Sequence, residues 1–158
     1  MTKQTIYYRA GGGVVVHNDT VLLLQRPSRG EVRLPKGHVE PNENVETTAL
    51  RETAEESGYT GLAIVGDLGS QVVEFDTGDR HVVRTERFFV MSLGDESIDA
   101  GGSPAMSAHS EEQFVSEWVG WDDALVMLTF FHEREWVRRA RRFLETESPM
   151  YRTRCFEE

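Results

Sequence analysis

Three glutamates within one short stretch are the densest chemical feature of this sequence. Glu52, Glu55 and Glu56 lie in RETAEES, at spacings of three and four residues. On a helix these spacings place the carboxylates on one side, where like charges repel each other. A hard divalent cation would remove that repulsion, because Mg²⁺ and Mn²⁺ prefer oxygen ligands. The spacing therefore predicts a metal site on a helix, with an ordinary solvated acidic face as the alternative.

The residues around these glutamates favour the metal site. Arg51 can pair with Glu55 one helical turn later. Glu43 precedes the helix, where the helix dipole also favours an acidic side chain. Lys36 and His38 lie in the loop before it, and both side chains can contact phosphate. The segment thus combines candidate metal ligands with candidate phosphate contacts.

This segment resembles the Nudix box, the pattern G-x5-E-x7-R-E-U-x-E-E-x-G-U, where U is a bulky aliphatic residue. The matching positions are Gly37, Glu43, Arg51, Glu52, Glu55, Glu56 and Gly58. Thr53 and Tyr59 replace the aliphatic residues at both of these positions, which concern packing and not chemistry. The resemblance covers most of residues 9–145. It implies the Nudix fold, an α+β sandwich of helices around a mixed sheet. It also implies hydrolysis of a nucleoside diphosphate derivative with one to three Mg²⁺ or Mn²⁺ ions.

The resemblance also assigns roles to the box residues. It implies that Glu52, Glu55 and Glu56 are metal ligands and catalytic residues, and that Arg51 orients Glu55. Three positions are expected to support the structure of the motif, namely Gly37, Glu43 and Gly58.

Two further site residues are candidates outside the box. The resemblance also implies a candidate general base and metal ligand at Glu112, in HSEEQFVSEW, because related tetraphosphate hydrolases carry a Glu in a similar stretch. The neighbouring Glu111 could serve instead, and a solvated loop acid is the ordinary alternative. Phe88, in the predicted strand TERFFVM, could stack on a base. Core packing is the alternative for Phe88 and for Phe89. His81 and Arg84 receive no role.

The motif does not determine the substrate. LPKGHVEP followed by RETAEESG is most similar to the diadenosine tetraphosphate hydrolases, so a dinucleoside polyphosphate is the expected substrate. The tyrosine expected beyond the box in those enzymes is absent, and Phe75 lies near its place. Three alternatives remain: a MutT-type nucleoside triphosphate pyrophosphohydrolase, a diphosphoinositol polyphosphate phosphohydrolase, and a nucleotide-sensing Nudix module without catalysis.

Hydrophobic and turn patterns predict the elements that must position these residues. Strands are expected at 13–17, 20–26, 61–66, 69–75, 81–93 and 117–121, and helices at 44–57, 121–130 and 131–145. Asn42 or Asn44 would cap the first helix, Gly58 would end it, and Asp122 would cap the second. The glycines at 11–13 indicate a bulge or a close backbone approach. The segments 27–38 and 94–112 are expected to be loops, and the tail from 146 irregular.

Composition limits the partners of the chain. Its 158 residues suit a single domain spanning 1–158. A formal net charge of −10 argues against nucleic acid and anionic membranes as partners. Cys155 is the only cysteine, and the N-terminus does not have the pattern of a secretory signal, so a cytoplasmic location is expected. The predicted partner is a small nucleotide or polyphosphate, and a homodimer is left open.

Overall fold

The structure of the protein is a computed structural model that describes residues 2–94, 97 and 113–147. Its strands are β1 (Gln4–His17), β2 (Thr20–Arg26), β3 (Glu31–Arg33), β4 (Lys36–His38), β5 (Leu62–Thr77), β6 (Arg80–Leu93) and β7 (Val115–Gly120). The helices are α1 (Val45–Ser57), α3 (Trp121–Met127) and α4 (Phe131–Glu147). None of the helices in the described part of the chain is both long enough and apolar enough for a membrane span.

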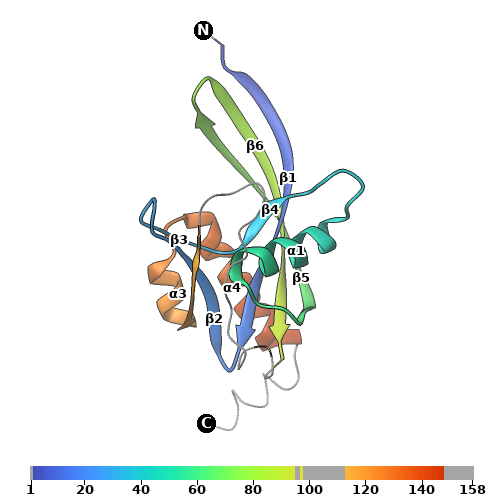
Figure 1. The fold of residues 1–158 in the computed structure, drawn as a ribbon, viewed down its shortest axis with the longest axis vertical. Helices are drawn as coiled ribbons and strands as arrows, with labels where there is room; N and C mark the ends of the chain where they lie inside the picture. Colours follow the sequence, from blue (N-terminus) through green and yellow to red (C-terminus); the bar gives the residue numbers. More distant parts are fainter. Residues whose placement is uncertain (1, 95–96, 98–112, 148–158) are drawn as a thin grey trace.

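The strands form one mixed sheet, in the order β3-β2-β1-β6-β5 (Figure 1). Its two central strands, β1 and β6, run parallel along most of their length. The remaining pairs are antiparallel, with β4 added to β1 and β7 added to β2. The outer halves of β1, β6 and β5 project beyond the body of the protein as a ribbon (Figure 1).

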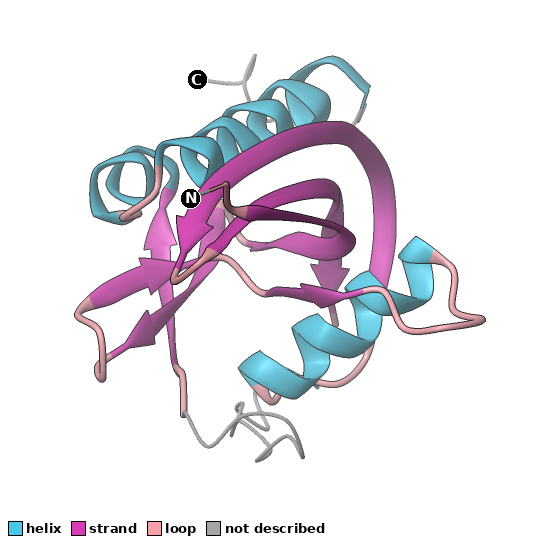
Figure 2. Ribbon diagram, turned by 90° about the horizontal axis from the view of Figure 1, so that it is seen from above, coloured by secondary structure: helices cyan, strands magenta, loops and turns pink. Residues whose placement is uncertain are grey.

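Helices cover both faces of this sheet (Figure 2). Adjacent residues of a strand point to opposite faces, so neighbouring apolar residues enter different cores. Val14 and Phe88 belong to the core beneath α3 and α4, whereas Val15 and Phe89 belong to the core beneath α1. The structure therefore confirms the predicted mixed sheet between helices.

Helix α1 has the predicted boundaries because its end signals are local. The Asn44 side chain accepts a hydrogen bond from the Thr47 amide at 2.8 Å and caps the first turn. Gly58 ends the helix with a φ of 81°, a left-handed conformation that glycine adopts without strain. Asn42 lies in the preceding turn with a φ of 66° and is not the cap.

Several other predicted boundaries were wrong. Strand β1 begins at Gln4, and the predicted loop 27–38 contains β3 and β4. The predicted strands 61–66 and 69–75 are a single strand, β5. Two register shifts in β5 accommodate its glycines as bulges, so they do not end the strand.

The C-terminal helices differ from prediction mainly at their ends. Helix α3 ends at Met127, and its N-cap is Gly120, so Asp122 lies inside the first turn and does not cap it. Helix α4 extends to Glu147. Its predicted inward face is confirmed, because Trp136, Ala140 and Leu144 are buried and Phe143 packs against the same core.

Candidate functional site

Glycines allow α1 to lie directly against the sheet. A Cβ atom at Gly11 would come within 2.9 Å of the Val45 carbonyl oxygen. A Cβ atom at Gly37, in β4, would lie 2.0 Å from the Glu52 carboxylate carbon. The glycines at 11–13 thus serve the close backbone approach that their sequence indicated. Gly37 leaves the space that the Glu52 carboxylate fills.

Arg51 organises the acidic residues of α1. Its Nε and Nη2 donate to the two carboxylate oxygens of Glu43 at 2.8 and 2.9 Å, and its Nη1 donates to Glu52 at 2.8 Å. Its contact with Glu55 is longer, at 3.5 Å. The expected contact between Arg51 and Glu55 is thus present, and the structure adds Glu43 and Glu52 as closer partners of Arg51. Arg51 also donates to the His38 carbonyl at 3.3 Å and so links α1 to β4.

Glu43 is fixed from several sides. The Thr48 hydroxyl donates to Oε1 at 2.5 Å, in addition to the two bonds from Arg51. These hydrogen bonds, above all those from Arg51, lower the pKa of Glu43 to about 2. With its oxygens engaged in this way, Glu43 stabilises the loop before α1, as expected of a structural residue.

Glu56 is a partly buried carboxylate that contacts the strand beside α1. Its Oε1 accepts a hydrogen bond from the Lys36 backbone amide at 2.8 Å. Burial raises the pKa of Glu56 to about 8, against the opposing effect of this hydrogen bond. Burial also raises the pKa of Glu52, and the hydrogen bond from Arg51 opposes this increase. Glu55 is more accessible, with its side chain 37% exposed.

The oxygen donors of Glu52, Glu55 and Glu56 are of the type that Mg²⁺ and Mn²⁺ prefer. A raised pKa in a buried carboxylate is also what a cation would reverse. Within the described residues, however, no three acidic, histidine or cysteine side chains already surround one point. The donor set fits a divalent metal, but these side chains have to rotate to share one.

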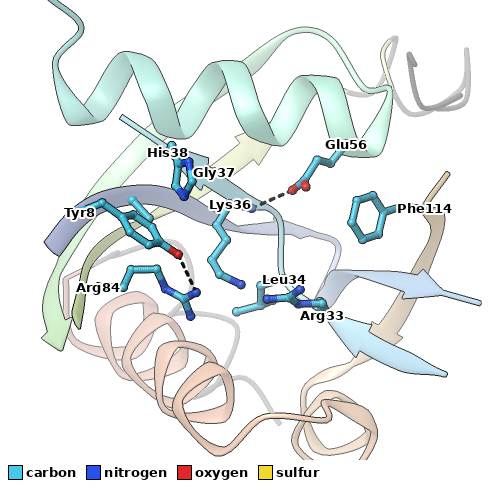
Figure 3. Close-up of a pocket in the computed structure, with 10 residues that line it drawn as sticks. Tyr8, Arg33, Leu34, Lys36, Gly37, His38, Glu56, Arg84 and Phe114 are labelled. Atoms are coloured by element: carbon cyan, nitrogen blue, oxygen red, sulfur yellow. Dashed lines mark hydrogen bonds between the residues drawn. The ribbon is translucent and has the colours of Figure 1, made fainter. Parts of the chain in front are cut away.

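A cavity of about 160 Å³ lies beside Glu56 (Figure 3). Lys36 and His38 both line it, as their predicted role requires. The His38 ring packs edge-on against Tyr8, with ring centroids 4.1 Å apart. Burial, followed by the charge of Arg84, lowers the pKa of His38 and favours its neutral form. Burial likewise lowers the pKa of Lys36, while Glu133 opposes this effect.

A second cavity of about 440 Å³ adjoins the first, because Arg33 and Arg84 line both. Two Arg–aromatic pairs form its walls. The Arg33 guanidinium lies 5.2 Å from the centre of the Phe130 ring, and that of Arg84 lies 5.2 Å from the centre of the Phe75 ring. Further lining side chains include Arg29 and His132.

Sequence reasoning assigned no role to Arg84. The structure holds it between the two cavities, with Nη1 donating to the Tyr8 hydroxyl at 3.2 Å and Nε 2.7 Å from Glu86 Oε2. The pairing of Tyr8 with Arg84 across β1 and β6 puts both side chains on one face. No local pattern in the sequence signals this register.

Phe88 does not line either cavity. Its side chain is fully buried, and its ring stacks on Trp136 with centroids 4.7 Å apart. The suggestion that Phe88 stacks on a substrate base is therefore corrected to core packing, which Phe89 shares in the other core. Glu111 and Glu112 lie outside the described residues.

Comparison with known proteins places these features in a family. The model of the NUDIX domain matches residues 7–144. The "Putative mutator protein MutT4" of Mycobacterium tuberculosis is 29% identical over 72% of this chain, which spans 55% of that relative's length. The asymmetrical bis(5'-nucleosyl)-tetraphosphatase of Rattus norvegicus is 28% identical over 70% of this chain and 69% of its own.

The fold comparison agrees with the sequence comparison. A crystal structure of a C. elegans Ap4A hydrolase binary complex superimposes with a TM-score of 0.67 at 22% identity, over 87% of this chain and 97% of that one. The match to the domain model covers the glutamates of α1, both cavities and the sheet that carries them. The chain belongs to the NUDIX domain family.

Proposed function

We propose that this chain hydrolyses a pyrophosphate link in a dinucleoside polyphosphate of the diadenosine tetraphosphate type. The observation that carries this proposal is the pair of adjoining cavities. They extend from Glu56 on α1, past Arg33 and Arg84, to the aromatic walls formed by Phe75 and Phe130. An elongated substrate with several phosphates and a base at its end matches this layout.

The charges along the cavities suit a phosphate chain. Arg33 and Arg84 stand at the junction, and Lys36 lies beside them in the first cavity (Figure 3). Guanidinium groups bind phosphate oxygens in a fork, and an ammonium adds a point charge. These cations offset, at this place, the negative charge that dominates the chain as a whole.

The aromatic walls suit a nucleoside base. Phe75 is 37% exposed and stands near the place where the related tetraphosphate hydrolases are expected to carry a tyrosine. A nucleobase that stacks on Phe75 or Phe130 would gain about 1–3 kcal/mol. Phe75 and Phe130 thus take the base-stacking role first considered for Phe88.

The box glutamates supply the reactive end of the site. Glu52, Glu55 and Glu56 would hold Mg²⁺ or Mn²⁺, and the bound ion would supply Lewis-acid stabilisation of phosphate oxygens and a more acidic water. Lys36, Arg33 and Arg84 bind and orient the phosphates. A general base removes a proton from the attacking water, and Glu112 is the proposed residue. Water adds to one phosphorus, and the bond from that phosphorus to the bridging oxygen breaks, which gives two nucleotides.

A nucleoside triphosphate pyrophosphohydrolase is the second candidate. The 29% identity to the relative named as a MutT4 mutator protein favours it. Such an enzyme needs to bind only one nucleoside, which the larger aromatic cavity would also accept, so the products of the reaction separate the two candidates.

Product analysis with Mg²⁺ tests both. The wild-type protein and the Glu56→Gln variant would each be incubated with the same panel of substrates. The panel contains diadenosine tetraphosphate, dGTP and its oxidised form, ADP-ribose and diphosphoinositol phosphate. The proposal expects ATP and AMP from diadenosine tetraphosphate, and their loss in the variant. It also expects Phe75→Ala to raise KM for this substrate, with Val72→Ala, an exposed position on the same strand, as the control. Preferential release of pyrophosphate from dGTP-type substrates would establish the second candidate instead.

A further inference from the structure

A carboxylate of α4 lies buried directly behind the first cavity. The Glu133 side chain is fully buried. Its Oε2 accepts a hydrogen bond from the Leu34 backbone amide at 3.1 Å and lies 3.6 Å from the Lys36 ammonium. Its Oε1 is buried without a hydrogen-bond partner among the described residues. The charge of Glu133 is therefore directed at Lys36 and the chain before it.

The short segment that carries Lys36 is anchored on three sides. Glu133 holds Leu34, and the Pro35 carbonyl accepts a hydrogen bond from the Gly13 amide at 3.2 Å. The Lys36 amide donates to Glu56. The backbone of Lys36 is thus tied to α1, while its side chain is tied to α4.

Lys36 needs a counterion in this position. Its side chain is only 8% exposed, and the charges of Arg33 and Arg84 repel it. The nearby buried Glu86 is engaged elsewhere, because the Trp136 indole donates to it at 2.9 Å and Arg84 lies 2.7 Å away. A buried ammonium without a counterion would be strongly unfavourable, so the rotamer of the Lys36 side chain depends on an acidic partner. Glu133 is the partner that the structure supplies.

We propose that Glu133 is a positioning residue, which holds the Lys36 ammonium at the cavity wall so that it can contact a substrate phosphate. This inference rests on the proposed binding of a polyphosphate beside Glu56. Glu133 itself is covered by Lys36 and does not touch the ligand. Its contribution to affinity should therefore pass entirely through Lys36.

The test is a double-mutant cycle with Glu133→Gln and Lys36→Met. Glutamine keeps an acceptor for the Leu34 amide and removes only the charge. The probe is methylenediphosphonate, a diphosphate analogue that cannot be hydrolysed, titrated calorimetrically with Mg²⁺ present. Glu135→Gln is the matched control, because Glu135 is on the same helix and pairs with Arg139 at the surface.

The proposal expects each single variant to weaken probe binding about tenfold, as the loss of one charge-assisted contact implies. The double variant should have the same affinity for the probe as Lys36→Met, and the Glu135→Gln control should have the affinity of wild type. With diadenosine tetraphosphate, Glu133→Gln should raise KM more than it lowers kcat. The proposal would be overturned if the losses of binding free energy in the two single variants added up in the double variant. An unchanged affinity of Glu133→Gln for the probe would also overturn it.

A second variant covers the case in which Glu133→Gln does not fold. Glu133→Asp keeps the charge and withdraws it by one methylene, so affinity should fall between those of wild type and Lys36→Met. Wild-type affinity in this variant would contradict a positioning role. Absence of turnover with an intact binding cycle would refute the proposed substrate alone, whereas turnover with additive losses would refute the role of Glu133 alone.

Discussion

The raised pKa of Glu56 predicts an unusual dependence of stability on pH in the metal-free protein. Burial raises this pKa from 4.5 to about 8. The folded state therefore binds the proton more tightly than the unfolded chain does. The contribution of Glu56 to stability is fully present below about pH 4.5 and is lost as pH rises toward about 8. The interval between the two pKa values corresponds to at most about 5 kcal/mol.

Other buried groups titrate over part of the same range. Burial raises the pKa of Glu52, so that residue also destabilises the fold as pH rises. Burial lowers the pKa values of His38 and His132, so both histidines have the opposite effect as pH rises through their range. The neutral isostere Glu56→Gln removes the contribution of Glu56 together with its coupling to Lys36 and Glu52, while both histidines are common to the two proteins.

The assay is urea unfolding in EDTA between about pH 5 and about pH 9, followed by tryptophan fluorescence. The advantage of Glu56→Gln over wild type should grow with pH, by at most about 1.4 kcal/mol per pH unit, and level off above about pH 8. Mg²⁺ should reverse this trend in wild type only, because it binds the ionised carboxylate of the folded state. Parallel stability curves for the two proteins would show that the burial of Glu56 does not govern its protonation.

Three further changes test separate parts of the site. Gly37→Ala should lower kcat roughly 100-fold by displacing the Glu52 carboxylate, while the melting temperature changes little. If Mg²⁺ activated that variant as strongly as it activates wild type, the displacement of Glu52 would be contradicted. Glu43→Gln should reduce the free energy of unfolding by about 1.5–3 kcal/mol through weaker bonds to Arg51, measurable in urea at pH 7. Phe88→Leu should destabilise the fold by about 1–3 kcal/mol and leave KM unchanged; a raised KM would restore its role in base stacking.

The features that could be predicted from the sequence are those encoded within one segment. The spacing of Glu52 and Glu56, the cap at Asn44 and the left-handed stop at Gly58 all depend on helix geometry alone. The predictions for α1 therefore required no knowledge of the rest of the fold. Arg51 illustrates the limit, because helix spacing favoured Glu55 as its partner, whereas Glu43 reaches it from the preceding loop.

The larger cavity could not be predicted because its walls come from distant segments. Phe75 is on β5 and Arg84 on β6, which the strand register brings together, and Phe130 comes from the segment just before α4. The pair Phe88 and Phe89 was ambiguous for a different reason. Both faces of β6 are covered by helices in this region, so its apolar run does not show which side chain faces which layer.

The placement of charge shows how an acidic chain can form a site for an anion. The net charge of −10 would repel a polyphosphate at long range. Around the cavities, however, cations are held by buried partners: Arg84 by Glu86 and Lys36 by Glu133. These carboxylates lie behind the cations and away from the cavity, so a ligand meets the positive ends of both pairs first. Such an arrangement fixes the cations before binding, which lowers the entropy cost of ordering them around a phosphate. The box glutamates would then repel the same ligand until a metal neutralises them, which makes the metal a condition for binding as well as for chemistry.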